Sequence, residues 1–142
     1  MTAYLDSSAM FKLLVDDEET DSGIRSALDL LGSISTSRLT YVETRAALAA
    51  ARRAGRLHGS GFEVAVEDFE AAWETFAIIE VTAGLAKDAA IVSETFGLRA
   101  GDAIQLASVR ALHLPEVTVV AWDRRLRTAA TAGGFACFPR EV

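Results

Sequence analysis

The stretch that decides the fold is Val-Thr-Val-Val-Ala-Trp-Asp at positions 117–123, a β-branched run that ends on an aspartate. It predicts a buried strand at 117–122, and Arg124–Ala132 after it has the apolar spacing of a helix. The same order opens the chain, where Thr2–Leu5 predicts a strand, Asp6 follows, and Ser7–Leu14 predicts a helix. An aspartate therefore follows a predicted strand at both ends of the sequence.

Helices and short strands alternate between these two segments. Further strands are predicted at 33–36, 78–81 and 135–138, and further helices at 18–31, 37–54, 61–77, Ala83–Phe96 and 101–112. Strands separated by helices favour parallel pairing, right-handed crossovers and a sheet covered on both faces. The sequence contains no internal repeat or linker, so we expect a single α/β domain over residues 1–142.

Composition is that of an ordinary globular protein, with 51% hydrophobic and 24% charged residues. The single Cys137 cannot form an internal disulfide, and the first residues lack the basic segment of a signal peptide. No apolar run approaches the roughly 20 residues that a membrane span needs. We expect a cytoplasmic protein.

The net charge of −6 argues against a nucleic-acid partner, but the charges are unevenly distributed. Acidic residues crowd into 16–19 and 63–74. Arginines gather elsewhere, at Arg38, Arg45, Arg52, Arg53 and Arg56, and again at Arg124, Arg125 and Arg127. Net charge therefore does not decide the partner.

Several catalytic motifs are absent, including the dinucleotide-binding glycine pattern, the P-loop and the G-x-S-x-G elbow. His58 and His113 lie near predicted helix ends without a partner at ligand spacing, so we interpret both as surface residues. One cysteine and two isolated histidines argue against a structural zinc site.

Four carboxylates remain: Asp6, Glu43, Asp102 and Asp123. Ligands of parallel α/β sheets bind beyond the carboxyl ends of the strands, where Asp6 and Asp123 are expected. Asp102 opens a predicted helix and Glu43 lies in the early turns of another, so all four could meet at one edge.

Three of the four acids have a purely structural interpretation. Asp6 and Asp123 are suitable N-caps, and Asp102 could complement a helix dipole. Glu43 is harder to explain, because Leu39, Val42, Ala46 and Ala50 surround it on the helix face that we expect to pack inward. No arginine lies three or four positions away, so a buried Glu43 would need a cation or a strong donor.

Four acids in one pocket would repel one another unless a divalent cation neutralised them. Ligands that offer only oxygen suit Mg²⁺ or Mn²⁺ rather than Zn²⁺. Such ions typically activate water and bind a phosphoryl group.

In four segments the sequence resembles the PIN-domain family, and within it the VapC-type toxin ribonucleases. These are Tyr-Leu-Asp-Ser-Ser-Ala at 4–9, residues 37–48 around Glu43, Leu-Arg-Ala-Gly-Asp-Ala-Ile-Gln-Leu-Ala at 98–107, and Val-Ala-Trp-Asp-Arg-Arg-Leu at 120–126. Their order and spacing run the full length of the chain.

The resemblance implies a three-layer α/β/α sandwich with a central parallel sheet of four to five strands. It implies that Asp6, Glu43, Asp102 and Asp123 hold Mg²⁺ or Mn²⁺, with Ser7 in support, and that the reaction is hydrolysis of RNA. Asp123 occupies the most variable of the four family positions. Arginines beside the site would contact phosphates, and the usual partners are a small protein antitoxin and a second copy of the chain.

The apolar stripe Phe62, Val66, Phe69, Trp73 and Phe76 recurs at helical spacing. It could form core, a dimer interface or an antitoxin groove, and we favour packing in the core or a dimer interface over a groove.

Two other functions fit parts of the sequence. A phosphatase or phospho-receiver would use Asp6 as nucleophile, but Ser8 stands where a dehalogenase-like site needs its second aspartate, and neither Lys12 nor Lys87 follows a late strand. A catalytically silent PIN-like module would bind RNA or protein without cutting, but degenerate members usually lose carboxylates and this chain keeps four.

Overall fold

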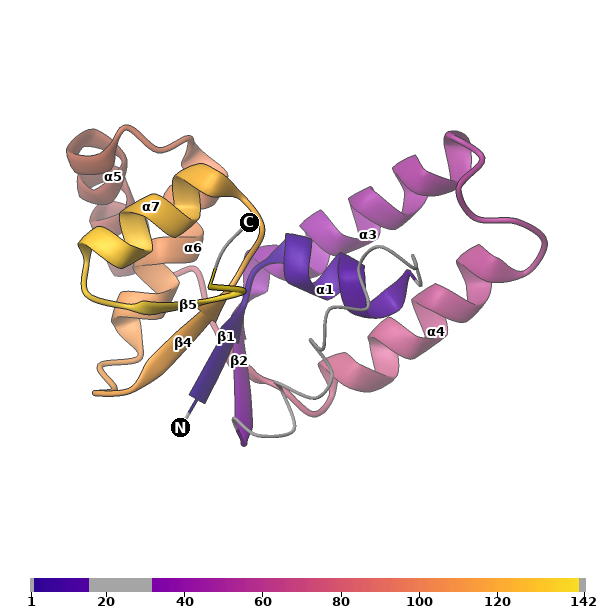
Figure 1. The fold of residues 1–142 in the computed structure, drawn as a ribbon, viewed down its shortest axis with the longest axis horizontal. Coiled ribbons are helices and arrows are strands. Elements are labelled where there is room, and N and C mark those ends of the chain that lie inside the picture. The colour runs from indigo at the N-terminus through magenta and orange to yellow at the C-terminus, as the bar shows by residue number, and fades with distance from the viewer. Residues whose placement is uncertain (1, 16–31, 141–142) are drawn as a thin grey trace.

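A parallel sheet forms the centre of the molecule, whose computed structural model describes residues 2–15 and 32–140 (Figure 1). Five strands of these residues pair in parallel in the order β3-β2-β1-β4-β5. Their bounds are β1 (Thr2–Leu5), β2 (Ser33–Ser37), β3 (Ala77–Ile79), β4 (Val117–Val120) and β5 (Ala136–Phe138). The predicted parallel sheet is confirmed.

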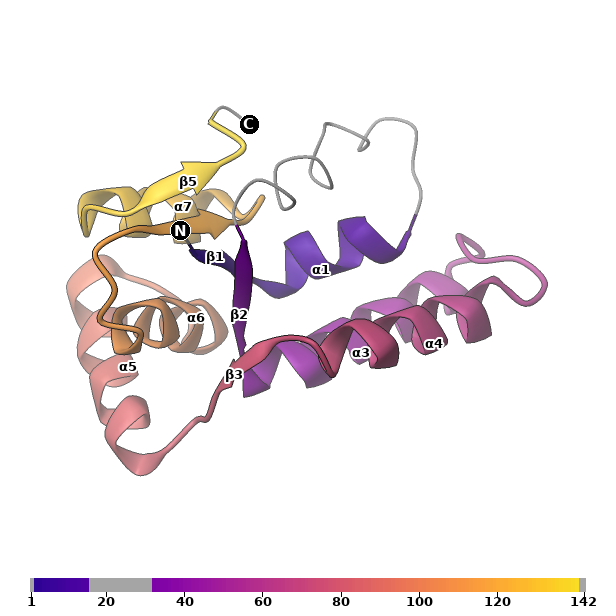
Figure 2. The same ribbon diagram turned by 90° about the horizontal axis from the view of Figure 1, so that it is seen from below.

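Helices cover both faces of the sheet, as predicted for a three-layer α/β/α sandwich. The helices α5 (Ala83–Phe96), α6 (Ala100–Ala111) and α7 (Arg124–Ala132) lie on one side, and α1 (Ser7–Leu14), α3 (Arg38–Arg53) and α4 (Gly61–Trp73) on the other (Figures 1 and 2). None of the helices in the described ranges is long and apolar enough to span a bilayer.

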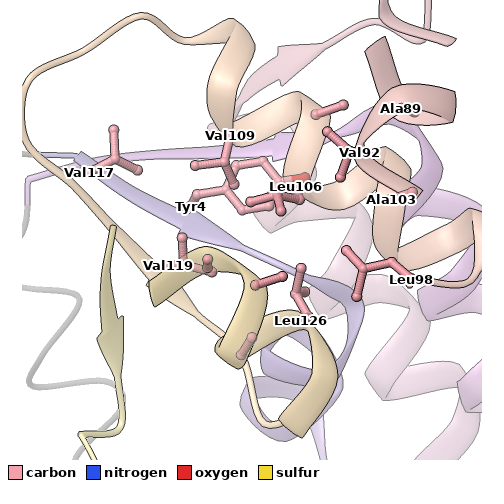
Figure 3. Packing of buried hydrophobic residues seen from close by; sticks show 14 of the residues in the cluster. Tyr4, Ala89, Val92, Leu98, Ala103, Leu106, Val109, Val117, Val119 and Leu126 are labelled. Carbon is pink, nitrogen blue, oxygen red and sulfur yellow. The ribbon is translucent and has the colours of Figure 1, made fainter. Parts of the chain in front are cut away.

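The central strand β1 supplies side chains to both layers because successive residues point to opposite faces. Tyr4 packs with Leu106, Val109 and other residues of the α5–α7 layer (Figure 3). Ala3 and Leu5 pack on the opposite face with residues of α1 and α4. Burial on both sides fixes the register of β1, and therefore fixes where Asp6 emerges from the sheet.

Predicted bounds agree with the structure at β1, α1, α5 and α7, and Gly97 ends α5 at a positive φ of 65°, as predicted for a helix stop. The helix predicted at 18–31 lies outside the described residues. The helix predicted to reach residue 77 ends at Trp73, since the Thr75 hydroxyl and the Thr75 N–H both bond the Ala72 carbonyl. Because the helix ends before Ala77, this residue pairs with Ser35, and β3 begins one residue earlier than the predicted start at 78.

The inward face predicted for α3 is wrong. Val42 is 64% exposed, and Ala46 and Ala50 are exposed as well. The buried face instead carries Thr40, Thr44, Leu48 and Ala51. Among them, Leu48 packs in a buried cluster with Val15 and Ala65.

The apolar stripe of α4 belongs mainly to the core. Phe69 is fully buried and Trp73 nearly so, and the Tyr41 ring lies 5.5 Å and 5.2 Å from their ring centroids. Phe62 and Val66 pack against a second cluster that contains Leu48. Phe69 and Trp73 therefore belong to the core, whereas Phe62, Val66 and Phe76 are only partly buried.

Candidate functional site

Asp6 follows β1 and begins α1 as its N-cap. Its Oδ1 accepts the Ala9 N–H at 2.9 Å and the Ser8 hydroxyl at 2.7 Å. Burial raises the pKa of the Asp6 carboxyl to about 6, although both hydrogen bonds oppose the rise, and the charges of Glu43 and Asp123 add to it. With only 4% of its surface exposed, Asp6 is the most enclosed of the predicted site residues.

Asp123 lies beside Asp6 because β4 pairs directly with β1. Leu5 is in register with Val120, and the Asp6 N–H reaches the Val120 carbonyl at 3.3 Å. Asp123 caps α7 and accepts the Leu126 N–H at 2.9 Å. The cap role proposed from sequence is thus present for both aspartates, and it does not remove either from the sheet edge.

Asp102 lies in the first turn of α6 and is half-buried. Partial burial raises the pKa of its carboxyl, and the charges of Asp123 and Glu43 raise it further. Arg99 and Arg125 act in the opposite direction. The Asp102 carboxylate therefore lies between acidic and basic neighbours.

Glu43 lies on α3 and is half-buried rather than enclosed. A donor exists that sequence spacing could not indicate, since Gln105 Nε2 of α6 lies 2.8 Å from Glu43 Oε1. Glu43 Oε2 lies next to Gly101, where a Cβ added to the glycine would approach to 3.3 Å. The strong donor required of a partly buried Glu43 is therefore present.

Two of the predicted carboxylates, Glu43 and Asp123, act on the other two at the carboxyl edge of the sheet. Glu43 and Asp123 raise the pKa of both Asp6 and Asp102. Within the described ranges, no three Asp, Glu, His or Cys side chains are close enough together to coordinate a single metal ion. The donor set fits a hard divalent cation, because it offers only oxygen and repels itself without one.

Ser8, rather than the predicted Ser7, provides the hydroxyl that contacts Asp6. Ser8 Oγ also accepts the Trp122 N–H at 3.0 Å, which links this helix start to the end of β4. Ser7 is half-buried at the start of α1. Its supporting role stays a prediction.

Gln105 and Tyr4 are functional candidates that sequence reasoning missed. Gln105 is 2% exposed and Tyr4 is fully buried, and the Tyr4 hydroxyl donates to Gln105 Oε1 at 2.5 Å. The only signal in the sequence was a polar residue inside the apolar run Ala-Ile-Gln-Leu-Ala at 103–107. Such a residue needs a buried partner.

The two arginine groups differ in their contacts. Arg38 pairs with Glu80, Arg45 pairs with Glu70 at 2.8 Å, and Arg52 lies 3.8 Å above the Phe62 ring centroid. Arg45 and Arg52 thus contact residues of α4, and Arg38 contacts a residue just after β3. Arg124 and Arg125, by contrast, line a cavity of about 340 Å³ with Phe96 and Thr128, next in sequence to Asp123.

His58 and His113 are both exposed, as predicted. Cys137 is a half-buried free thiol in β5.

Comparisons with known proteins agree with this geometry. The PIN domain family profile matches residues 3–131. The chain is 41% identical over 140 residues to ribonucleases VapC45 and VapC49 from two strains of Mycobacterium tuberculosis, covering 98% of this chain and 96% of each relative. A chain of a toxin–antitoxin complex from Klebsiella pneumoniae has the same fold, with a TM-score of 0.69, 18% identity and 99% coverage of both chains.

Proposed function

The chain belongs to the PIN-domain family, and we propose that it is a VapC-type toxin, an endoribonuclease that hydrolyses RNA with Mg²⁺ or Mn²⁺. The observation that carries the proposal is the gathering of acids at one sheet edge, where the charges of Glu43 and Asp123 raise the pKa of both Asp6 and Asp102. Its support is strengthened by 41% identity to named ribonucleases over almost the whole chain. The family match over residues 3–131 supports a single domain.

The same four carboxylates would hold the cation. Asp6, Glu43 and Asp123 each use one oxygen to accept a hydrogen bond from the protein. Within the described residues the second oxygen of each accepts none, so it is available to a cation. A bound Mg²⁺ or Mn²⁺ supplies Lewis-acid activation of water and neutralises charge on the phosphate.

The protein's own residues bind and orient the RNA. The charges of Arg99 and Arg125 oppose the rise in the pKa of the Asp102 carboxyl, which supports both arginines as partners of an RNA phosphate at the site. Arg124 extends this basic surface along the neighbouring cavity. Such contacts position the RNA backbone and do not recognise the base sequence. Cleavage specificity would then depend on the shape of the RNA and on contacts to its bases.

We also propose a small protein antitoxin and a second copy of the chain as partners, acting in the cytoplasm. The fold shared with a chain of a toxin–antitoxin complex supports the antitoxin.

Cleavage of end-labelled RNA by the purified chain tests the function. We expect cutting with Mg²⁺ or Mn²⁺ and none with EDTA, and Asp102→Asn should lose orders of magnitude in rate because one ligand is lost. Asp88→Asn removes an exposed acid of α5 and is the matched control, with wild-type activity expected. Equal rates for Asp102→Asn and wild type, or equal rates with EDTA, would contradict the proposal.

Growth provides the biological test. Expression of the wild-type chain should arrest bacterial growth, and Asp102→Ala at a matched protein level should not. Equal growth of the two strains would argue against a toxin.

A further inference from the structure

We propose that Gln105 is a positioning residue that orients Glu43 toward the divalent cation, and that Tyr4 fixes Gln105 in turn. The inference rests on the proposed metal-dependent function. It adds two buried residues, from β1 and α6, to a site whose ligands are all carboxylates.

The contacts form one continuous chain through the core. The Tyr4 hydroxyl lies 2.5 Å from Gln105 Oε1, and Gln105 Nε2 lies 2.8 Å from Glu43 Oε1. Thr40 Oγ1 lies 3.1 Å from the same Gln105 nitrogen. Tyr4 and Gln105 are almost completely buried, whereas Glu43 is partly exposed at the site. The chain therefore leads from the core to a candidate ligand.

Charge determines which way the Gln105 amide faces. An ionised Glu43 can only accept, so Gln105 must present its NH₂ group to it. The amide oxygen then faces Tyr4, whose hydroxyl must donate. A tyrosine hydroxyl is protonated at neutral pH, so the proton that this bond requires is in place. Each member of the chain has one orientation that satisfies its neighbours.

Glu43 is also restricted from its other side. Its Oε2 lies by Gly101, where even a methyl group would approach to 3.3 Å. Oε1 is held by Gln105 and Oε2 is left without a hydrogen bond among the described residues. The geometry thus dedicates one oxygen to the protein and the other to the site.

Glu43 needs such a support more than Asp6 and Asp123 do. Asp6 and Asp123 have short side chains, and each is fixed by a backbone N–H group of the helix that it caps. Glu43 has one more rotatable bond and projects from the second turn of α3, where no backbone N–H is free to hold it. A side-chain donor from another helix fulfils that role.

A double-mutant cycle on Mn²⁺ binding tests the proposal. Isothermal titration calorimetry would give the dissociation constant for wild type, Gln105→Leu, Glu43→Gln and the double variant. We expect Gln105→Leu to weaken Mn²⁺ binding by about 10- to 100-fold when Glu43 is present, as loss of an outer partner typically does. In the Glu43→Gln background the same change should have no effect, because there is no ligand left to position.

Thr44→Val is the matched control on α3. Thr44 is fully buried, one residue from Glu43, and among the described residues its hydroxyl has no hydrogen-bond partner. The Mn²⁺ affinity of the Thr44→Val variant should equal that of wild type. Equal weakening by Thr44→Val and Gln105→Leu would mean that general packing is responsible, and would overturn the proposal.

Unchanged affinity in Gln105→Leu, or an equal loss with and without Glu43, would also overturn it. If Gln105→Leu does not fold, the same Mn²⁺ titrations are made with Tyr4→Phe, which keeps the ring in the core and removes only the hydroxyl. Weakening only in the presence of Glu43 supports the proposal, and unchanged binding overturns it. Absence of Mn²⁺ binding by wild type would instead refute the proposed metal dependence.

Discussion

The Ser8 hydroxyl donates to Asp6 Oδ1 across 2.7 Å. Because the serine Oγ also accepts the Trp122 N–H at 3.0 Å, this one side chain joins the ends of β1 and β4. Those two strand ends carry Asp6 and Asp123. The separation of two candidate ligands therefore depends on a side chain that is not a predicted ligand.

Ser8→Ala should destabilise the fold and raise the pKa of Asp6 further above 6. It removes a hydrogen bond to a carboxylate, which typically costs about 1.5–3 kcal/mol of unfolding free energy. Urea unfolding and NMR titration of the Asp6 carboxyl measure the two effects. Ser7→Ala is the control and should match wild type in both, and an equal loss in the two variants would contradict the assignment to Ser8.

Metal-free protein should become more stable as the pH falls from about 7 towards 4. Burial raises the pKa of Asp6 from 3.8 to about 6, so the folded state takes up a proton in this range before the unfolded state does. The free energy of unfolding should therefore rise on acidification, by about 3 kcal/mol from this group. Urea unfolding in EDTA at several pH values gives the slope.

Asp6→Asn should remove this part of the pH dependence and should be more stable than wild type near neutral pH without metal. A wild-type slope of the opposite sign over the same range, or an Asp6→Asn variant with an unchanged slope, would show that Asp6 is not the group responsible.

Gly101→Ala should stabilise α6 and weaken Mn²⁺ binding. Alanine is favoured over glycine in helices by up to about 1 kcal/mol. Its Cβ would lie 3.3 Å from Glu43 Oε2, so the flexible carboxylate rather than the backbone must move. Thermal unfolding and calorimetry separate the two effects, and Gly84→Ala in the first turn of α5 is a control without a carboxylate contact. A stabilised variant with wild-type Mn²⁺ affinity would show that Glu43 Oε2 can move away from the added methyl group without loss of binding.

Arg125→Gln should weaken RNA binding in a salt-dependent way and raise the pKa of Asp102 further. Loss of one phosphate contact to single-stranded RNA should reduce the slope of log affinity against log salt by about 0.7. Binding is measured in the Asp6→Asn background so that the RNA stays intact. Arg45→Gln breaks the pair with Glu70 and should leave the slope unchanged. Equal slopes for Arg125→Gln and its parent would place the phosphates elsewhere.

Much of the fold was predictable because local signals agreed with the tertiary structure. The β-branched residues of β4 and the aspartates after β1 and β4 marked both strands and the edge where the acids gather. Parallel pairing then followed from the alternation of elements.

Two features could not be read locally. Alanine-rich α3 carries two stripes of small or apolar residues, and the one containing Thr40 and Thr44, less hydrophobic by composition, is the buried one. The hydrogen-bond partners of Gln105 are far away in sequence: Glu43 is 62 positions away, Thr40 is 65 and Tyr4 is 101. No periodicity within a helix reports partners so distant in sequence.

The central place of β1 in the sheet also has a consequence for biosynthesis. Residues 2–5 leave the ribosome well before residues 117–120, which form one of their two neighbouring strands. Asp6 and Asp123 cannot meet until that strand has emerged and docked. A nascent chain that ends before residue 117 therefore lacks both Asp123 and the strand that brings it to the edge where Asp6 lies.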